Sequence, residues 1–292
     1  MNKVNAWLIA IRLKTLSASI SGVITGLAFS ILEIGKINHL IAGLTLLLAI
    51  ILQIISNFAN DVYDFEKGVD TIERLGPTRA TQAGYLSSFA IKVGIMILVI
   101  LSMIIGFYLA SISSYHLLWW GLLAIVSAIF YTAGPYPLGY YGFGDILVFV
   151  FFGPVAVIGT FFIQTLNINF LIIIISIAIG FLATAILVVN NLRDHHSDLN
   201  AGKKTLVVKL GISFTKYQYT FLLLFPFLII LILFFYNSIP PKLLISLLAI
   251  ILSIKPLITV WKKTGKKLNS ALVDTGIVLL LFSILIFLAV NI

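Results

Sequence analysis

The sequence predicts an all-α integral membrane protein that crosses the bilayer nine times. Hydrophobic residues make up 61% of the 292 positions, charged residues make up 10%, and the mean hydropathy is +1.14. A soluble domain of this length could not bury so much apolar surface, so lipid must cover part of it. The chain has no cysteine, which excludes disulfides and thiolate-bound metal ions.

Nine apolar segments approach the roughly 20 residues that a transmembrane helix needs. We expect them to form a single membrane domain over residues 1–292. The predicted spans are 16–32, 40–59, 89–110, 117–132, 146–163, 170–189, 219–235, 243–260 and 271–290.

The basic residues predict an orientation in the membrane. With nine spans, all 19 Lys and Arg residues except Lys36 and Lys242 fall on one side. Loops rich in Lys and Arg stay in the cytoplasm, so this side and the N-terminus are expected to be cytoplasmic. The odd number of spans then places the C-terminus outside, with the protein in the inner (cytoplasmic) membrane. The same rule explains the net charge of +9 without nucleic acid as a partner.

A first polar cluster continues the second span without a helix breaker as far as Gly68. Residues three and four apart share a face of a helix, so the cluster is predicted to form one stripe of oxygen ligands. The stripe consists of Asn57, Asn60, Asp61 and Asp64. Asp70 follows Gly68, so the helix does not fix its direction.

A second polar cluster continues the sixth span in the same way. Its members are Asn190, Asn191, Asp194 and Asp198. The pattern Asn-x-x-x-Asp thus occurs twice, each time at the cytoplasmic end of a long span. Basic residues follow both copies: Arg74 and Arg79 after the first, Lys203 and Lys204 after the second.

These residue types indicate a magnesium and phosphate site. Carboxylate and amide oxygens suit Mg²⁺, which binds through a few carboxylates together with phosphate groups. Two facing clusters could hold two Mg²⁺ ions and a diphosphate, while the basic residues contact the remaining phosphate oxygens. One such cluster alone is better explained by solvated loop residues and helix caps. Two clusters with the same spacing, side and chemistry favour the functional interpretation.

Three stretches of the sequence resemble the UbiA superfamily of intramembrane aromatic prenyltransferases. The resemblance is greatest to the branch that prenylates 1,4-dihydroxy-2-naphthoate in menaquinone biosynthesis. The stretches are Asn60-Asp61-x-x-Asp64 running on to Arg74-Leu75-Gly76-Pro77-Thr78-Arg79, then Tyr131 to Asp145, and Asn190-Asn191-Leu192-Arg193-Asp194 running on to Leu206; Arg12 to Leu16 is a shorter match.

The resemblance implies helices arranged around a central cavity and a particular reaction. A polyprenyl group would pass from polyprenyl diphosphate to an aromatic acid acceptor, 1,4-dihydroxy-2-naphthoate, with loss of diphosphate and CO₂. Mg²⁺, as two ions, is the implied cofactor. Tyr131, Tyr136 and Tyr140 are candidates for stabilising an allylic cation, although Tyr is also enriched at membrane interfaces for other reasons.

The resemblance also implies roles for individual residues. The residues expected to be catalytic are Asp61, Asp64, Asp194 and Asp198. The residues expected to bind substrate are Lys14, Asn57, Asn60, Arg74, Arg79, Tyr131, Asn190, Asn191 and Lys203. The residues expected to bind metal are Asn57, Asp61, Asp64, Asp70, Asn190, Asp194 and Asp198.

Two other functions remain open from the sequence. A UbiA-type enzyme with another acceptor, such as 4-hydroxybenzoate or homogentisate, would carry similar clusters. A membrane transporter is an alternative from a different class. Transporter sites lie near the bilayer midplane, however, whereas the acids of this chain gather at one boundary, which favours the enzyme.

Overall fold

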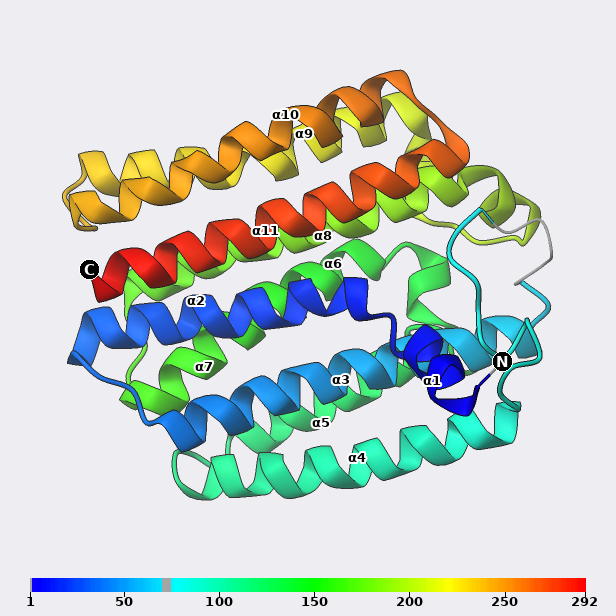
Figure 1. Cartoon of the computed structure of the whole chain (residues 1–292), viewed down its shortest axis with the longest axis horizontal. Helices are drawn as coiled ribbons and strands as arrows, with labels where there is room; N and C mark the ends of the chain where they lie inside the picture. Colours follow the sequence, from blue (N-terminus) through cyan, green and yellow to red (C-terminus); the bar gives the residue numbers. More distant parts are fainter. Residues whose placement is uncertain (1, 70–74) are drawn as a thin grey trace.

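The computed structural model describes residues 2–69 and 75–292, and all regular structure in these ranges is helical. Long helices run side by side in a layered bundle (Figure 1). The α-helices are α1 (Lys3–Ile11), α2 (Leu16–Ile34), α3 (His39–Glu66), α4 (Ser88–Ser111), α5 (Leu117–Phe130), α6 (Gly144–Val150), α7 (Ala156–Thr165), α8 (Phe170–Asn200), α9 (Leu206–Phe235), α10 (Ala249–Lys262) and α11 (Leu268–Asn291). The predicted all-α membrane fold is confirmed.

Short helical segments connect several of these helices. They are the 3₁₀ turns η1 (Leu13–Thr15), η2 (Leu138–Tyr141), η4 (Pro241–Leu248) and η5 (Gly265–Lys267), and the π-helical turn η3 (Phe151–Val155). The predicted span 146–163 is therefore composite, because α6, η3 and α7 follow one another with Pro154 in the π turn. Proline cannot donate the helical hydrogen bond at this point, which accounts for the irregular turn.

Each of the nine predicted spans corresponds to a helical segment. Within the described ranges, eight helical segments are long and apolar enough to cross a membrane. The remaining one, α5, is apolar but has 14 residues. At 1.5 Å per residue it is about 21 Å long, less than the roughly 30 Å of a hydrocarbon core. The two chain termini lie at opposite ends of the bundle (Figure 1).

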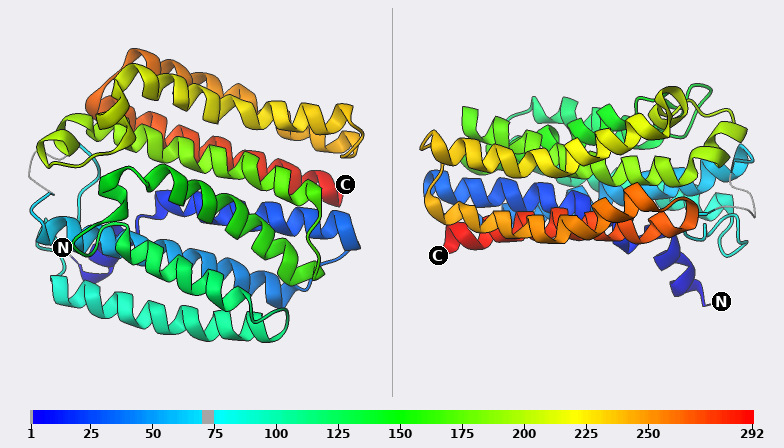
Figure 2. Two further views of the ribbon diagram at one scale, coloured as in Figure 1. Left: turned by 180° about the vertical axis from the view of Figure 1, so that it is seen from behind. Right: turned by 90° about the horizontal axis from the view of Figure 1, so that it is seen from above.

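The helix that precedes the first span was not predicted. α1 ends at Ile11, the next residue, Arg12, has a φ of 56° in the left-handed region, and α2 begins after the short η1 turn. This break turns α1 away from the long helices, so that it projects from the bundle (Figure 2). The predicted span 16–32 therefore coincides with α2 alone.

Small residues let the helices of the bundle approach closely. A Cβ atom on Gly26 of α2 would lie 2.6 Å from Thr160 Cβ and 2.7 Å from Val157 O of α7. A Cβ atom on Gly153 would lie 2.7 Å from Gly180 Cα of α8. In a bilayer, where lipid is as apolar as the side chains, such close backbone contacts supply much of the packing energy.

Both polar clusters lie on helices that extend past their apolar spans. α3 has 28 residues and ends at Glu66, just before Gly68 with its φ of 69°. α8 has 31 residues and carries the second cluster in its last turns. The clusters are therefore helical, as predicted, and both lie at the N-terminal end of the bundle (Figure 1).

Candidate active site

A cavity of about 1200 Å³ opens between the helices and reaches both polar clusters. Apolar residues such as Leu52, Trp120 and Phe162 line most of its length. The charged and amide residues at its polar end are Arg12, Gln53, Asn57, Asn60, Asp64, Arg79, Asn190, Asn191, Asp194, Asp198 and Lys203. One cavity thus has an apolar lining along most of its length and a cluster of oxygen ligands and cations at one end.

Asp64, on α3, has partners from several parts of the chain at the polar end. Its Oδ2 accepts a hydrogen bond from Arg79 Nη2 at 3.0 Å, and its Oδ1 accepts one from Tyr140 Oη at 2.6 Å. Asp64 and Arg79 are 3% and 4% exposed. Burial excludes much of the competing water, so this ion pair is stronger than one at the surface, although both groups also lose hydration.

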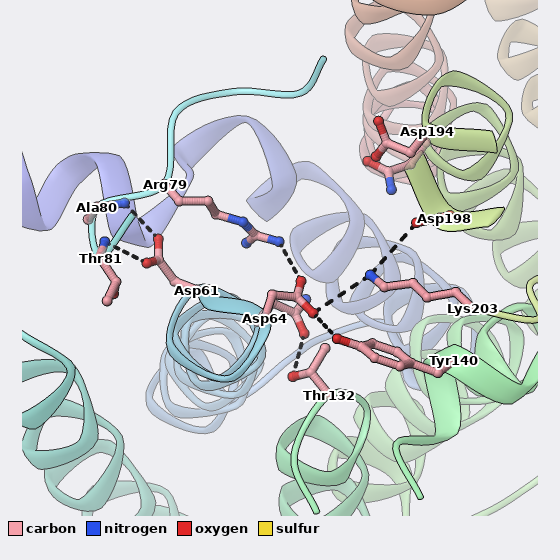
Figure 3. A network of polar contacts seen from close by, with 12 residues as sticks. Asp61, Asp64, Arg79, Ala80, Thr81, Thr132, Tyr140, Asp194, Asp198 and Lys203 are labelled. Carbon is pink, nitrogen blue, oxygen red and sulfur yellow. Dashed lines mark hydrogen bonds and ion pairs between the residues drawn. The ribbon is translucent and has the colours of Figure 1, made fainter. Parts of the chain in front are cut away.

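Lys203 bridges the two clusters. Its Nζ lies 3.7 Å from Asp64 Oδ1 and 3.7 Å from Asp198 Oδ1, and it also lies 4.4 Å from the centre of the Tyr140 ring. Figure 3 shows Lys203 between the two acids, which come from α3 and α8. The fold therefore brings one acid from each cluster together with Lys203.

Asp61 does not join the other acids, and its assignment as a metal ligand does not fit its position. Its Oδ2 accepts from the Ala80 backbone N–H at 2.9 Å and its Oδ1 from the Thr81 backbone N–H at 2.8 Å. The side chain is fully buried, and it points away from Asp64 toward this loop (Figure 3). Asp61 therefore fastens the loop that carries Arg79, because a buried carboxylate is best satisfied by such donors.

Asp194 and Asn190 of the second cluster are held by Arg193, a residue to which the sequence assigned no role. Arg193 donates from Nε to Asp194 Oδ1 at 2.8 Å and from Nη2 to Asp194 Oδ2 at 2.6 Å. Nη2 also donates to Asn190 Oδ1 at 2.7 Å. Such a two-point contact fixes the carboxylate plane. Arg193 lies within the Asn190-x-x-x-Asp194 motif, and this position is the feature of the sequence that could have indicated its role.

The asparagine side chains of the two clusters have different hydrogen-bond partners. Asn57 donates from Nδ2 to Ile11 O at 2.8 Å and to Thr15 Oγ1 at 2.9 Å, which ties α3 to the turn after α1. Asn60 Oδ1 accepts from Thr132 Oγ1 at 3.0 Å. Asn191 also lines the cavity. The Oδ1 of Asn57, the atom that would bind a metal ion, accepts from Gln53 Nε2 at 3.1 Å. Both ends of the Asn57 amide therefore have protein partners, and its role as a metal ligand stays a prediction.

The predicted phosphate-binding cations divide into three groups. Arg79 and Lys203 line the polar end of the cavity, whereas Lys14 is exposed and does not line it. The left-handed turn at Arg12 redirects the chain, so Arg12, two residues earlier, lines the cavity instead. Arg74 and Asp70, also predicted for the site, lie outside the described residues.

The loop between α5 and α6 contributes the tyrosines. Tyr131 lines the cavity and packs on a glycine, since a Cβ on Gly139 would lie 2.6 Å from Tyr131 Cε1. Tyr140 also lines it, but Tyr136 is 73% exposed and does not. The expected group of three tyrosines is therefore reduced to two at the cavity.

Lys67, at the end of α3, holds this loop in place. Its Nζ donates to Thr132 O at 2.7 Å and to Gly134 O at 2.9 Å, and lies 5.0 Å from the centre of the Tyr140 ring. Partial desolvation lowers the pKa of Lys67 from its ordinary value, while Asp64 opposes this shift and Lys203 adds to it. Lys67 is a second cation beside Tyr140 that sequence reasoning did not select.

The donor set at the polar end fits Mg²⁺ with a phosphate ligand. Asp64, Asp194 and Asp198 line one cavity together with the amides of Asn190 and Asn191, and all are hard oxygen donors. Among the described residues, no group of three or more His, Cys, Asp or Glu side chains forms a metal site by itself. A cation there would need phosphate and water oxygens to complete its shell, which is the usual situation for Mg²⁺.

Comparison with known proteins relates this site to one enzyme family. The chain is 44% identical over 216 residues to 1,4-dihydroxy-2-naphthoate octaprenyltransferase of Haemophilus influenzae, covering 72% of this chain and 70% of that relative. It is 41% identical over 217 residues to the Escherichia coli protein of the same name, again covering 72% and 70%.

The fold has counterparts among solved structures. A UbiA homolog from Archaeoglobus fulgidus bound to GPP and Mg²⁺ superposes with a TM-score of 0.74 at 19% identity, covering 98% of this chain and all of the other. At this identity the likeness establishes the fold alone. The UbiA prenyltransferase family, by contrast, matches the sequence itself over residues 20–284. This chain, with its two polar clusters at one end of a membrane-embedded cavity, belongs to the UbiA prenyltransferase family.

Proposed function

We propose that this enzyme transfers a polyprenyl group from polyprenyl diphosphate to 1,4-dihydroxy-2-naphthoate, with loss of diphosphate and CO₂, in menaquinone biosynthesis. The names of the two relatives that are 44% and 41% identical to it over 216 and 217 residues support this acceptor. The observation that carries the proposal is the cavity itself. Its apolar length suits a prenyl chain, and its polar end suits a diphosphate.

The acids and amides at the polar end are the proposed Mg²⁺ ligands. They are Asp64, Asn190, Asn191, Asp194 and Asp198. Bound Mg²⁺ would neutralise negative charge on the diphosphate as it leaves. The proposal omits Asp61, whose oxygens accept from Ala80 and Thr81 N–H groups.

Arg79 and Lys203 are the proposed cationic contacts of the diphosphate. Both line the polar end of the cavity, and each is held by an acid of the proposed site. Arg12 lines the same cavity and replaces Lys14 in this role. Cations fixed before the substrate arrives stabilise the developing charge of the leaving group without reorganising during the reaction.

The chemistry follows from this arrangement. The allylic C–O bond breaks, and its electron pair leaves with the diphosphate. The electron-rich naphthalene ring then attacks the prenyl cation and forms a C–C bond. The bond between the ring and its carboxylate breaks, CO₂ leaves, and the electron pair of that bond restores the aromatic ring. The apolar lining keeps water from the cation, and Tyr131 and Tyr140 are aromatic side chains of the lining at the polar end.

The acceptor and the released diphosphate are both anionic and water-soluble, so the polar end is proposed to face water. The Lys and Arg residues gathered on that side support the cytoplasm as the side it faces.

The test is a transfer assay with purified protein, Mg²⁺ and a labelled polyprenyl diphosphate. 1,4-Dihydroxy-2-naphthoate, 4-hydroxybenzoate and homogentisate are offered separately. We expect prenylation of the naphthoate, with one CO₂ released per diphosphate, and no turnover in excess EDTA. Transfer to 4-hydroxybenzoate but not to the naphthoate would overturn the proposed acceptor. A folded enzyme without activity toward any of the three would overturn the proposed reaction.

A further inference from the structure

A buried arginine joins the second cluster to the beginning of α11. The side chain of Arg193 is 1% exposed, and in addition to Asp194 and Asn190 it contacts Asn269, with Nη1 donating to Asn269 Oδ1 at 2.9 Å. Asn269 is the second residue of α11 and lies far along the chain from both polar clusters. The guanidinium therefore has one of its anchors outside the two polar clusters.

The side-chain amide of Asn269 also contacts the segment 75–81, which carries Arg79 to Asp64 of the first cluster. Asn269 Nδ2 donates to Leu75 O at 3.0 Å. The side chain of Leu75 packs against the turn before α11, because a Cβ on Gly265 would lie 3.7 Å from Leu75 Cδ1. Two independent contacts thus place residue 75 against the beginning of α11.

With this contact, the segment that carries Arg79, residues 75–81, is hydrogen-bonded at both of its ends. At its far end, Ala80 and Thr81 donate their N–H groups to Asp61 of α3. At its near end, the Leu75 carbonyl is held by Asn269. Arg79 lies between the two anchors and reaches Asp64. With both ends of the segment fixed, the side chain between them loses less conformational entropy when it binds an anion.

We propose that Asn269 is a positioning residue that holds both halves of the diphosphate site, through Arg193 on α8 and through Leu75 at the start of the segment that carries Arg79. The inference rests on the proposed function only in taking the polar end as the place where Mg²⁺ and diphosphate bind. It is independent of which aromatic acceptor is used.

Two substitutions separate the two contacts of Asn269. In Asn269→Asp the carboxylate still accepts from Arg193 but cannot donate to the Leu75 carbonyl. In Asn269→Leu both contacts are lost at similar volume. Ser270→Ala is the matched control, because Ser270 is exposed and its hydroxyl donates to Lys267 O in the adjoining turn.

For each variant we measure the KM for polyprenyl diphosphate, the Mg²⁺ concentration for half-maximal activity and the melting temperature. Rates are normalised to the concentration of folded enzyme. Removing supports of metal ligands typically costs about 10- to 100-fold in metal affinity or activity. For Asn269→Leu we expect about a 10-fold rise in both the KM for polyprenyl diphosphate and the Mg²⁺ concentration for half-maximal activity. For Asn269→Asp we expect the rise in KM, with the Mg²⁺ requirement near that of the wild type. Ser270→Ala should match the wild type.

A purely structural role for Asn269 gives a different result. Both variants would then melt at lower temperature while KM and the Mg²⁺ requirement stay at wild-type values, which would overturn the proposal. If Asn269→Leu does not fold, an unchanged KM in Asn269→Asp overturns it equally. Wild-type enzyme that prenylates a different acceptor would overturn the proposed function alone, and the comparison is then made with that acceptor.

Discussion

Tyr140 is the residue at which the two polar clusters and the α5–α6 loop meet. Its hydroxyl lies 2.6 Å from Asp64 Oδ1, and its ring lies 4.4 Å from Lys203 Nζ and 5.0 Å from Lys67 Nζ. A hydroxyl that donates to a carboxylate in this way orients it and withdraws some of its charge. Tyr140 therefore affects how Asp64 is presented to the cavity.

Replacing Tyr140 by Phe tests this contact while keeping the ring. A hydrogen bond to a charged group is worth roughly 1.5–3 kcal/mol. We expect kcat/KM for polyprenyl diphosphate to fall about 10- to 100-fold, measured in the transfer assay. Tyr136→Phe is the control, since that side chain is 73% exposed. Wild-type kinetics in Tyr140→Phe would show that the hydroxyl has no part in the reaction.

Asp61 and Asp64 should respond differently to amide substitution. Asp61→Asn sets an NH₂ group against one of two backbone N–H donors, so we expect a lower melting temperature with a nearly unchanged Mg²⁺ requirement. Asp64→Asn should raise that requirement about 10-fold or more. Magnesium titrations of activity distinguish them. An equal rise in both variants would restore Asp61 as a metal ligand.

At the scale of single helices, close contacts between α2 and α7 depend on glycine. Gly26→Ala places a methyl group 2.7 Å from the Val157 carbonyl oxygen, so backbone must shift, at a cost of about 1–3 kcal/mol. Gly43→Ala, on an exposed face of α3 with nothing within 4 Å of the new Cβ, is the control. We expect Gly26→Ala alone to lower the melting temperature in detergent. Equal stability of the two variants would contradict the described α2–α7 packing.

The helices were predictable from sequence because an apolar segment in a bilayer must satisfy its own backbone hydrogen bonds. The breaks between helices were harder to predict. The left-handed turn at Arg12 and the π turn around Pro154 are local backbone conformations that leave no signal in the hydropathy of the sequence. The resemblance implied Lys14 for the site, but with the left-handed turn at Arg12 it is Arg12 that lines the cavity.

Helical spacing predicted which residues share a stripe but not where each one points. At about 100° per residue, Asp61 lies near one edge of the first stripe and Asp64 near its middle. That difference directs Asp61 to the Ala80–Thr81 turn and Asp64 into the cavity. The contact of Asn269 depends on tertiary packing between distant segments, which neither periodicity nor motif spacing encodes.

At the scale of the whole molecule, the opposite positions of the termini agree with an odd number of crossings (Figure 1). The absence of native cysteine makes this directly testable. We expect Lys3→Cys to react with a membrane-impermeant maleimide only after the membrane is opened, and Asn291→Cys to react in intact cells. Labelling of both positions from the same side would contradict the topology.

One polar site, built from α3 and α8 together, is proposed to bind both Mg²⁺ and diphosphate. Binding of a short polyprenyl diphosphate to purified protein, measured by calorimetry with and without Mg²⁺, tests it most directly, because no acceptor is needed. We predict Mg²⁺-dependent binding that is weakened about 10-fold or more by Asp64→Asn on α3 and equally by Asp198→Asn on α8. Binding that is independent of Mg²⁺, or that survives either substitution unchanged in a folded protein, would contradict the account.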